Sequence, residues 1–364
     1  MSDEPSETAT ERVRWSSPLP DAPGGTLLPV LDAACVVGTP AYMCLTSSEG
    51  GVAWLAEKEM IFPGTPVLLA GDLVARPEDG IMVVRDVRTG ETTAAWPEPA
   101  MSTPAATPDG DLVYCRWTAE GGGELKRTGP DGTTRWSRPL SRRLSAAPLV
   151  HHDVVIVGDG PRLRAFGLDG TPRWSADRDG VHATDAPTTD DAEIEGPVVA
   201  LGDALLAELR WYSGAGRYLF HPRSETIVRL DPAIPVHGTP VPVDRPAGGL
   251  VALGPTEESS WVVVLIDLDG RVIWTHRTPA EPRALLATTG GDVLVFCGPT
   301  LDRWQNYHQW YDLSEECFVR RLDPSGAERW TWRAPAPLTY RPALDHSGRI
   351  YTAAPGNLWV LEPQ

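Results

Sequence analysis

Short apolar segments separated by turn residues recur along the whole chain. Examples are Asp111–Cys115, Val154–Val157, Leu250–Leu253 and Val293–Phe296. Segments of this length between glycine-rich and proline-rich turns are typical of β-strands. No stretch of ten or more residues carries the apolar stripe of an amphipathic helix. The pattern therefore predicts an all-β protein.

A glycine followed four residues later by a tryptophan marks a repeated unit. The motif occurs five times, and its tryptophans are Trp54, Trp136, Trp174, Trp274 and Trp330. Gly90–Trp96 is the same motif with two extra residues, and Trp15 occupies the same strand without a glycine turn before it. Successive tryptophans lie 39, 42, 40, 38, 100 and 56 residues apart, and the interval of 100 contains a degenerate copy at Val228–His237. The chain therefore contains eight repeats with a period of about 40 residues.

Each repeat has room for four strands. A proline marks the inner strand, as at Pro66 and Pro148; an apolar strand follows, the third strand leads into the glycine turn, and the fourth carries the tryptophan. Four-stranded antiparallel units at this period predict a β-propeller, because each unit leaves a face that only its neighbour can cover. We therefore expect a single all-β domain, an eight-bladed β-propeller over residues 11–364, preceded by a disordered tail at residues 1–10.

The two ends of the chain supply complementary parts of one blade. Asn357–Glu362 has the pattern of a third strand with no fourth strand after it, and Arg12–Trp15 has the pattern of a fourth strand with none before it. Pairing of these strands would complete the eighth blade and close the ring. Because closure removes the strand edges that often drive association, we expect a monomer.

The motif tryptophans have a structural explanation. A ring of blades needs large apolar side chains between adjacent sheets, and an indole also has an N–H that can donate to a backbone carbonyl. The glycine of the motif permits the positive φ of a tight hairpin. We therefore assign a structural role to Trp15, Trp54, Trp96, Trp136, Trp174, Trp274 and Trp330.

An aspartate precedes the glycine in the clearest copies, which are Asp86–Gly90–Trp96, Asp267–Gly270–Trp274 and Asp323–Gly326–Trp330. This arrangement resembles the pyrroloquinoline-quinone-type propeller repeat, shared by quinoprotein dehydrogenases and by the lipoprotein propeller of outer-membrane assembly. The resemblance covers nearly the whole chain and implies eight blades. Quinoprotein dehydrogenases also resemble one another in an adjacent Cys-Cys disulfide and a calcium site, and neither can be matched here. We therefore expect no quinone, no metal and no other cofactor.

Loops between second and third strands share one face of the predicted propeller, here called the top face, with the connections between blades. Aromatic and arginine-rich segments are expected there, in insertions at residues 210–224 and 299–316 and in a shorter loop after Arg116. The candidate binding residues are Arg116, Trp117, Arg210, Trp211, Tyr212, Arg217, Tyr218, His221, Arg303, Trp304, Tyr307, His308, Trp310 and Tyr311. Such side chains dominate protein contact surfaces, and the repeat does not need them. The alternative is that they form lids over their own loops, with arginine stacked on tryptophan.

The net charge of the chain and the composition of its first residues indicate which classes of partner to expect. A third insertion, residues 177–195, holds seven carboxylates and is expected to be a solvated inter-blade loop, because it lacks the spacing of a calcium loop. The formal net charge of −17 would repel a nucleic acid. The first ten residues lack the features of a secretory signal, and no segment is apolar enough to span a bilayer. We expect a cytoplasmic protein with neither a nucleic-acid nor a membrane partner.

The reactive side chains do not form a recognisable catalytic motif. Two cysteine pairs, Cys35 with Cys44 and Cys297 with Cys317, fall on neighbouring predicted strands, but in a cytoplasm we expect buried reduced thiols. His221 is an acid–base candidate by position alone, as is the other histidine of the inserted segments. The sequence therefore favours a non-catalytic scaffold that recognises a protein or peptide. The alternative is an enzyme acting on a small molecule at the central funnel, with a quinoprotein-like oxidoreductase suggested by the resemblance.

Overall fold

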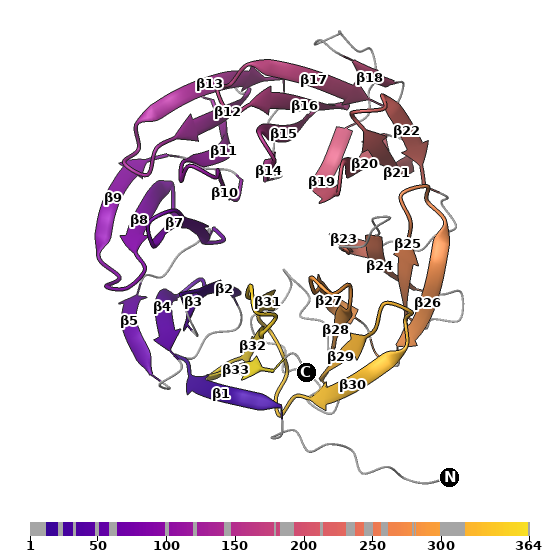
Figure 1. Cartoon of the computed structure of the whole chain (residues 1–364). Coiled ribbons are helices and arrows are strands. Elements are labelled where there is room, and N and C mark those ends of the chain that lie inside the picture. Colours follow the sequence, from indigo (N-terminus) through magenta and orange to yellow (C-terminus); the bar gives the residue numbers. More distant parts are fainter. Residues whose placement is uncertain are drawn as a thin grey trace.

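Eight small β-sheets are arranged around a central opening (Figure 1). The computed structural model describes residues 12–20, 25–31, 34–47, 51–57, 64–98, 102–118, 122–141, 147–177, 180–182, 193–211, 214–230, 237–243, 250–255, 261–278, 280, 282–298 and 317–362. These residues contain 33 strands, β1 to β33, and no helix. The described chain accordingly offers no helix that is long and apolar enough to cross a membrane.

Each sheet runs from an inner strand near the central opening to an outer strand at the rim. Four of them are β31 (Ala343–Leu344), β32 (Ile350–Ala354), β33 (Asn357–Leu361) and β1 (Val13–Pro18); β2 (Thr26–Val30), β3 (Ala34–Gly38), β4 (Tyr42–Ser47) and β5 (Val52–Glu57); β6 (Val67–Leu69), β7 (Leu73–Glu78), β8 (Ile81–Asp86) and β9 (Thr92–Pro97); and β10 (Ala105–Ala106), β11 (Leu112–Trp117), β12 (Gly123–Thr128) and β13 (Thr134–Leu140).

The other four sheets follow the same order. They are β14 (Leu149–His151), β15 (Val154–Asp159), β16 (Arg162–Gly167), β17 (Pro172–Asp177) and β18 (Gly180–His182); β19 (Glu193–Leu201), β20 (Ala204–Trp211), β21 (Gly214–His221) and β22 (Thr226–Arg229); β23 (His237–Pro242), β24 (Leu250–Pro255), β25 (Trp261–Ile266) and β26 (Val272–Thr278); and β27 (Pro282–Ala287), β28 (Val293–Cys297), β29 (Phe318–Leu322) and β30 (Glu328–Arg333).

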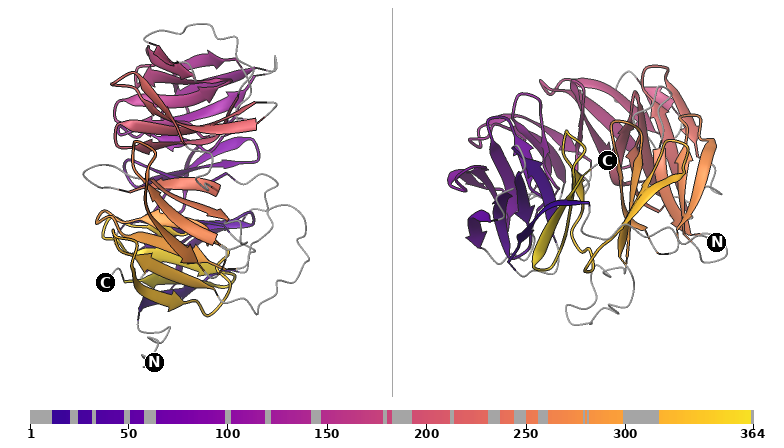
Figure 2. Two further views of the ribbon diagram at one scale, coloured as in Figure 1. Left: turned by 90° about the vertical axis from the view of Figure 1, so that its right-hand side faces the viewer. Right: turned by 60° about the horizontal axis from the view of Figure 1, so that its bottom comes forward.

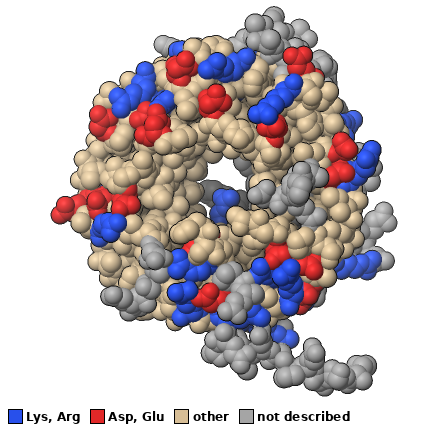
Figure 3. All heavy atoms as spheres, in the orientation of Figure 1, with Lys and Arg blue, Asp and Glu red and all other residues tan. Residues whose placement is uncertain are grey.

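The predicted blade number and strand order are confirmed. Seven sheets have four strands, and the sheet of β14 to β18 has a fifth strand outside the expected four. Figure 2 shows the ring from the side, where the strands of each blade run between its two faces. Figure 3 shows the opening at the centre of one face.

The first and last strands pair with each other, as predicted. Strand β1 is antiparallel to β33, with Trp15 opposite Val360 and Pro18 opposite Asn357. The pairing continues past the strand end, because the amide of Glu362 donates to the carbonyl of Arg12 at 3.1 Å. The two chain ends thus contribute to one sheet, called here the terminal blade.

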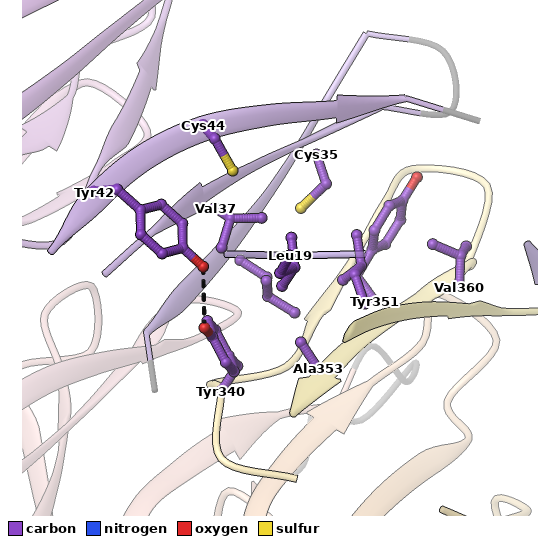
Figure 4. Close-up of a cluster of buried hydrophobic side chains, with 11 residues drawn as sticks. Leu19, Cys35, Val37, Tyr42, Cys44, Tyr340, Tyr351, Ala353 and Val360 are labelled. Atoms are coloured by element: carbon purple, nitrogen blue, oxygen red, sulfur yellow. Dashed lines mark hydrogen bonds between the residues drawn. The ribbon is translucent and has the colours of Figure 1, made fainter. Parts of the chain in front are cut away.

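Eight clusters of buried apolar side chains hold the blades together. Each cluster contains residues from two neighbouring sheets, and together the eight clusters cover all eight junctions. At the junction of the terminal blade with β2–β5, Cys35 and Val37 pack against Tyr351 and Val360 (Figure 4). Burial of one such side chain contributes about 1.5–3 kcal/mol. No blade buries its own faces, so the ring is the stable unit.

All seven motif tryptophans lie in outer strands, and a β-bulge accompanies each of them. In β13 the register against β12 shifts between Trp136 and Thr134, which leaves Arg135 as the extra residue. Corresponding shifts occur in β1, β5, β9, β17, β26 and β30. The degenerate copy in β22 has neither the tryptophan nor the shift. The bulge adds local twist to the outer strand and is therefore part of the repeat.

The turn glycine of a blade lies against the tryptophan of the preceding blade. A Cβ on Gly170, whose φ is +81°, would lie 2.8 Å from the indole of Trp136. The same indole donates its N–H to the carbonyl of Leu168 in that turn, at 2.8 Å. Trp54 and Trp274 donate equivalent bonds to carbonyls of the next blade. The predicted N–H bond is therefore confirmed for three tryptophans, and the glycine supplies close approach as well as positive φ.

Two blades depart from this contact between a motif tryptophan and the glycine turn of the next blade. The degenerate copy has Leu230 in place of the indole, and a Cβ on Gly270 would lie 3.1 Å from it. The terminal blade has no glycine turn before β1, and the guanidinium of Arg12 instead lies 4.8 Å from the ring centre of Trp330. A cation over an indole face contributes about 0.5–1 kcal/mol at an exposed site.

We predict that Gly170→Ala destabilises the protein more than Gly356→Ala. Both glycines have φ of +81°, but a Cβ on Gly356 meets nothing within 4 Å. Gly356→Ala should therefore cost only the left-handed backbone conformation, about 1–2 kcal/mol. Gly170→Ala should add about 1–3 kcal/mol of overpacking against Trp136. Equal losses in urea unfolding of the two variants would show that the indole contact does not constrain this position.

Candidate functional site

Backbone hydrogen bonds identify the top face. The amide of Glu98, on the connection leaving β9, donates to Gly80 in the β7–β8 turn at 2.8 Å. Leu19, after β1, donates to Gly356 in the β32–β33 turn at 3.0 Å. Connections between blades therefore share a face with the turns between second and third strands, as predicted.

Trp117 protrudes from the top end of β11. Its backbone pairs with Gly123 of β12 at the end of the hairpin, and the residue is 42% exposed. Among the tryptophans whose burial the structure describes, Trp117 is the one that is exposed. The strand end thus carries a partly exposed indole.

The neighbouring Arg116 is held by two carboxylates. Its Nη1 donates to Glu98 at 3.1 Å, and its Nε donates to Glu124. Burial opposes the charge of Arg116, but Glu124 and Glu98 outweigh this effect and raise the pKa of the guanidinium. Arg116 therefore fixes the strand end that carries Trp117.

Glu98 is a buried carboxylate with three donors, and sequence reasoning missed it. It is 1% exposed and accepts from Tyr114 Oη at 2.9 Å, from Lys126 Nζ at 2.6 Å and from Arg116. Burial and the Glu98 charge raise the pKa of Tyr114 far above its usual range. In the sequence, only the position of Glu98 directly after the proline of an outer strand distinguishes it from other acidic residues. Glu98 can be buried as a charged group because these three donors satisfy its carboxylate oxygens.

Other top-face charges are satisfied in the same way. Arg76 is 1% exposed and donates to the carbonyls of Gly64, Tyr42 and Thr39 at 3.0, 3.2 and 2.5 Å, which links the blade β6–β9 to the blade β2–β5. Burial lowers the pKa of Arg76 to about 10. These contacts identify Arg76 as a structural residue between blades.

Within the predicted insertion, residues 210–224, the described residues 210–211 and 214–221 belong to strands instead of a loop. Strands β20 and β21 pair up to Trp211 and Gly214, so only residues 212–213 separate them. Tyr218 is 7% exposed in the cluster between β14–β18 and β19–β22, and this burial explains why the segment forms a strand. Arg217 pairs with Glu208 at 2.7 Å, and His221 lies at the opposite end of β21 from the top face.

The structure therefore places Arg116–Trp117 and Arg210–Trp211 at corresponding strand ends, in β11 and β20, on the same face. It does not place Tyr218 or His221 there. Several candidates lie outside the described residues, namely Tyr212, Arg303, Trp304, Tyr307, His308, Trp310 and Tyr311.

The acidic insertion, residues 177–195, is not wholly a loop. Gly180–His182 forms β18, which pairs with β17, and β19 begins at Glu193. The remaining residues of the insertion, 178–179 and 183–192, lie outside the described residues, as does the predicted tail at residues 1–10. Strand β18 was not predictable from the sequence, because three residues are too few for a periodic pattern.

The described residues do not form a site for a metal or a quinone. No group of three or more His, Cys, Asp or Glu side chains among them is suited to hold a metal ion. The unpartnered indole nitrogens of Trp15, Trp96 and Trp330 lie on outer strands of three different blades. A quinone would need several such groups around one cavity, so these residues do not fit it.

The cysteines are buried and unbridged, as predicted. Burial raises the pKa of Cys44, Cys115 and Cys297 to about 12 and that of Cys35 beyond this. The thiolate is the reactive form, so these side chains are poor nucleophiles at neutral pH.

A hollow on the opposite face is also occupied by structural contacts. It is lined by Asp109, Asp111, Arg127, Arg135, Trp136, Leu168 and Asp169. Arg127 lies in its wall, pairs with both Asp109 and Asp111, and donates to the carbonyl of Leu168. All three guanidinium nitrogens of Arg127 donate to groups within the protein. The top face with Trp117 is therefore the better candidate for a binding site.

We predict that Glu98→Ala lowers the free energy of unfolding by about 3–5 kcal/mol, because it leaves Lys126 and Tyr114 buried without their carboxylate. Urea unfolding measures the loss. The exposed acid Glu57, changed to alanine, is the control and should cost less than about 0.5 kcal/mol. A similar small loss for both variants would contradict the structural role of Glu98.

We predict that stability falls as pH decreases below about 6.5. Burial and His152 lower the pKa of His151, and burial and Arg320 lower that of His276. The unfolded chain therefore binds more protons than the folded chain below the ordinary histidine pKa of about 6.5, and it is favoured there. Unfolding at pH 7.5 and 5.5 should reveal the loss. His276→Gln should reduce this dependence of stability on pH, and an unchanged dependence would contradict the prediction.

Comparisons with known proteins support the fold. A family model described as outer membrane protein assembly factor BamB matches residues 93–216. No curated protein matches the chain. The crystal structure of BamB from Moraxella catarrhalis matches with a TM-score of 0.64 and 16% identity, over 96% of this chain and 99% of that chain. A eukaryotic initiation factor matches with a TM-score of 0.53 and 12% identity, over 89% and 90%. The predicted resemblance to the pyrroloquinoline-quinone-type propeller repeat is confirmed.

Proposed function

We propose that this propeller is a non-catalytic scaffold that binds a protein or peptide partner through its top face. The observation that carries the proposal is the 42% exposure of Trp117 at a strand end fixed by Arg116. Tryptophan and arginine supply a large share of binding energy at protein interfaces. A preorganised aromatic side chain also loses little conformational entropy on binding.

The position of Trp117 in the ring supports a surface of more than one blade. Ile81, at the top of the neighbouring blade β6–β9, is 39% exposed. Trp211 ends β20 as Trp117 ends β11, so an equivalent backbone site occurs two blades further along the ring. A partner lying across the top face would meet several of these sites together.

The family model supports the same class of function. Its description is that of an assembly factor, and assembly requires contact with other proteins. The candidates Arg303, Trp304, Tyr307, His308, Trp310 and Tyr311 lie outside the described residues, and their part in this surface stays a prediction from the sequence. The cytoplasmic location and the monomeric state stay predictions from the sequence.

The test measures the affinity of a partner captured from native lysate. Trp117→Ala should weaken binding by at least tenfold, as expected for a hot-spot residue, and should leave thermal unfolding nearly unchanged. Trp211→Ala and Trp304→Ala are tested in the same assay.

Val52→Ala is the matched control, because Val52 is also an exposed apolar residue (38%) but lies on the outer strand β5. Unchanged binding in all three tryptophan variants would refute the top-face proposal. The variants could instead lose stability while the fraction that stays folded binds the partner with unchanged affinity. This result would show that the tryptophans pack as lids over their own loops.

A further inference from the structure

The outer edge of one blade carries an added strand. Strand β18 pairs antiparallel with the end of β17, with Ser175 opposite His182 and Asp177 opposite Gly180, and lies outside it in Figure 1. The pairing covers the three residues after Trp174, and they are 0%, 0% and 7% exposed. The geometry of this repeat therefore accepts an antiparallel strand immediately after the tryptophan.

Most other outer edges are protected at the corresponding three residues. A proline occupies one of them in β9, β13 and β1, at Pro97, Pro139 and Pro18. Proline has no N–H for an added strand and is a common means of blocking a sheet edge. In β30 the corresponding residues, Thr331–Arg333, lack proline, but the bulge residue there is the cation Arg329. Strand β22 has only four residues and lies next to β18.

Strand β26 lacks these protections. Trp274 corresponds to Trp174, so Thr275–Arg277 corresponds to the residues that β18 covers. This segment contains no proline, and within the described chain β26 pairs only with β25. The outer edge of β26 is therefore equivalent to the edge that the protein itself fills in the blade β14–β18.

Exposed apolar side chains distinguish β26 further. Val272 and Ile273 are 46% and 48% exposed. Ile273 is the extra residue of the bulge, and the corresponding residue is an arginine in β1, β13, β17 and β30. An isoleucine at a position where the repeat usually has a cation indicates a surface that gains by being covered.

We propose that the outer edge of β26 binds an extended acidic segment of a partner protein by strand addition. Thr275–Arg277 would pair with it in the antiparallel manner of β18, and main-chain hydrogen bonds would supply most of the affinity. Val272 and Ile273 take up its apolar side chains. The exposed Arg277 favours carboxylates on the added strand, in a chain whose net charge is −17. Arg271 pairs with Asp269 at 3.4 Å and therefore contributes less.

Strand β5 provides the internal comparison. Its residues after the tryptophan, Leu55–Glu57, also lack proline, and Leu55 is 41% exposed. The triplet ends in Glu57 where β26 has Arg277. An acidic strand is therefore repelled at β5 and attracted at β26, although both edges are apolar.

The test uses a synthetic nine-residue peptide of alternating valine and glutamate and the intact protein. Hydrogen exchange should slow in Thr275–Arg277 when the peptide is added, and binding should weaken as salt increases. An alternating valine–lysine peptide should bind at least tenfold more weakly. Protection at β5, equal binding of both peptides, or no protection at β26 would overturn the proposal.

Variants separate this surface from the top face. Ile273→Asp and Arg277→Glu should each weaken binding of the valine–glutamate peptide at least tenfold, whereas Leu55→Asp should not. Arg277→Glu alters an exposed side chain and keeps the test decisive if Ile273→Asp unfolds. Trp117→Ala should leave peptide binding unchanged, so failure here is distinct from failure of the top-face proposal. An equal loss in Leu55→Asp would contradict the assignment to β26.

Discussion

The contact between the indole of one blade and the glycine turn of the next is the constraint on which the ring depends. At Trp136 and Gly170 the approach is too close for a Cβ, and the same indole donates to Leu168 of that turn. Each contact fixes a pair of neighbouring blades, and apolar clusters fill the space between their sheets. Because a blade is not stable without its neighbours, each junction between two blades has to be specified by its own contacts.

The last junction uses the same principle with different residues. Strand β1 enters the terminal blade without a glycine turn, and Arg12 covers the indole of Trp330. The cluster that joins β27–β30 to the terminal blade contains Trp332 and Trp359, whose ring centres are 6.1 Å apart. The chain ends are thus bound by pairing and packing together, which compensates for the missing turn.

A satisfied network of charges gives the top face its rigidity. Glu98 and Arg76 are almost wholly buried, and each makes three hydrogen bonds. Buried charges of this kind are tolerated only when their partners are complete. Their role is to hold strand ends, and Trp117 remains at the surface of that rigid frame. The outer strand edges differ from the top face, because an added strand pairs there through main-chain hydrogen bonds, which a proline in the outer strand would prevent.

The repeat by itself determined the eight blades, the strand order, the pairing of Arg12–Trp15 with Asn357–Glu362 and the position of the motif tryptophans, because each follows from local spacing. Only the tertiary structure decided that Tyr218 is buried, that β20 pairs with β21 as far as Trp211 and Gly214, and that Gly180–His182 adds a strand to β17. It also decided that Glu98 is shared by three donors from two other strands. The burial of Tyr218, the strand β18 and the contacts of Glu98 are not shared by the other repeats, so a pattern with a period of two or of 40 residues contains no information about them.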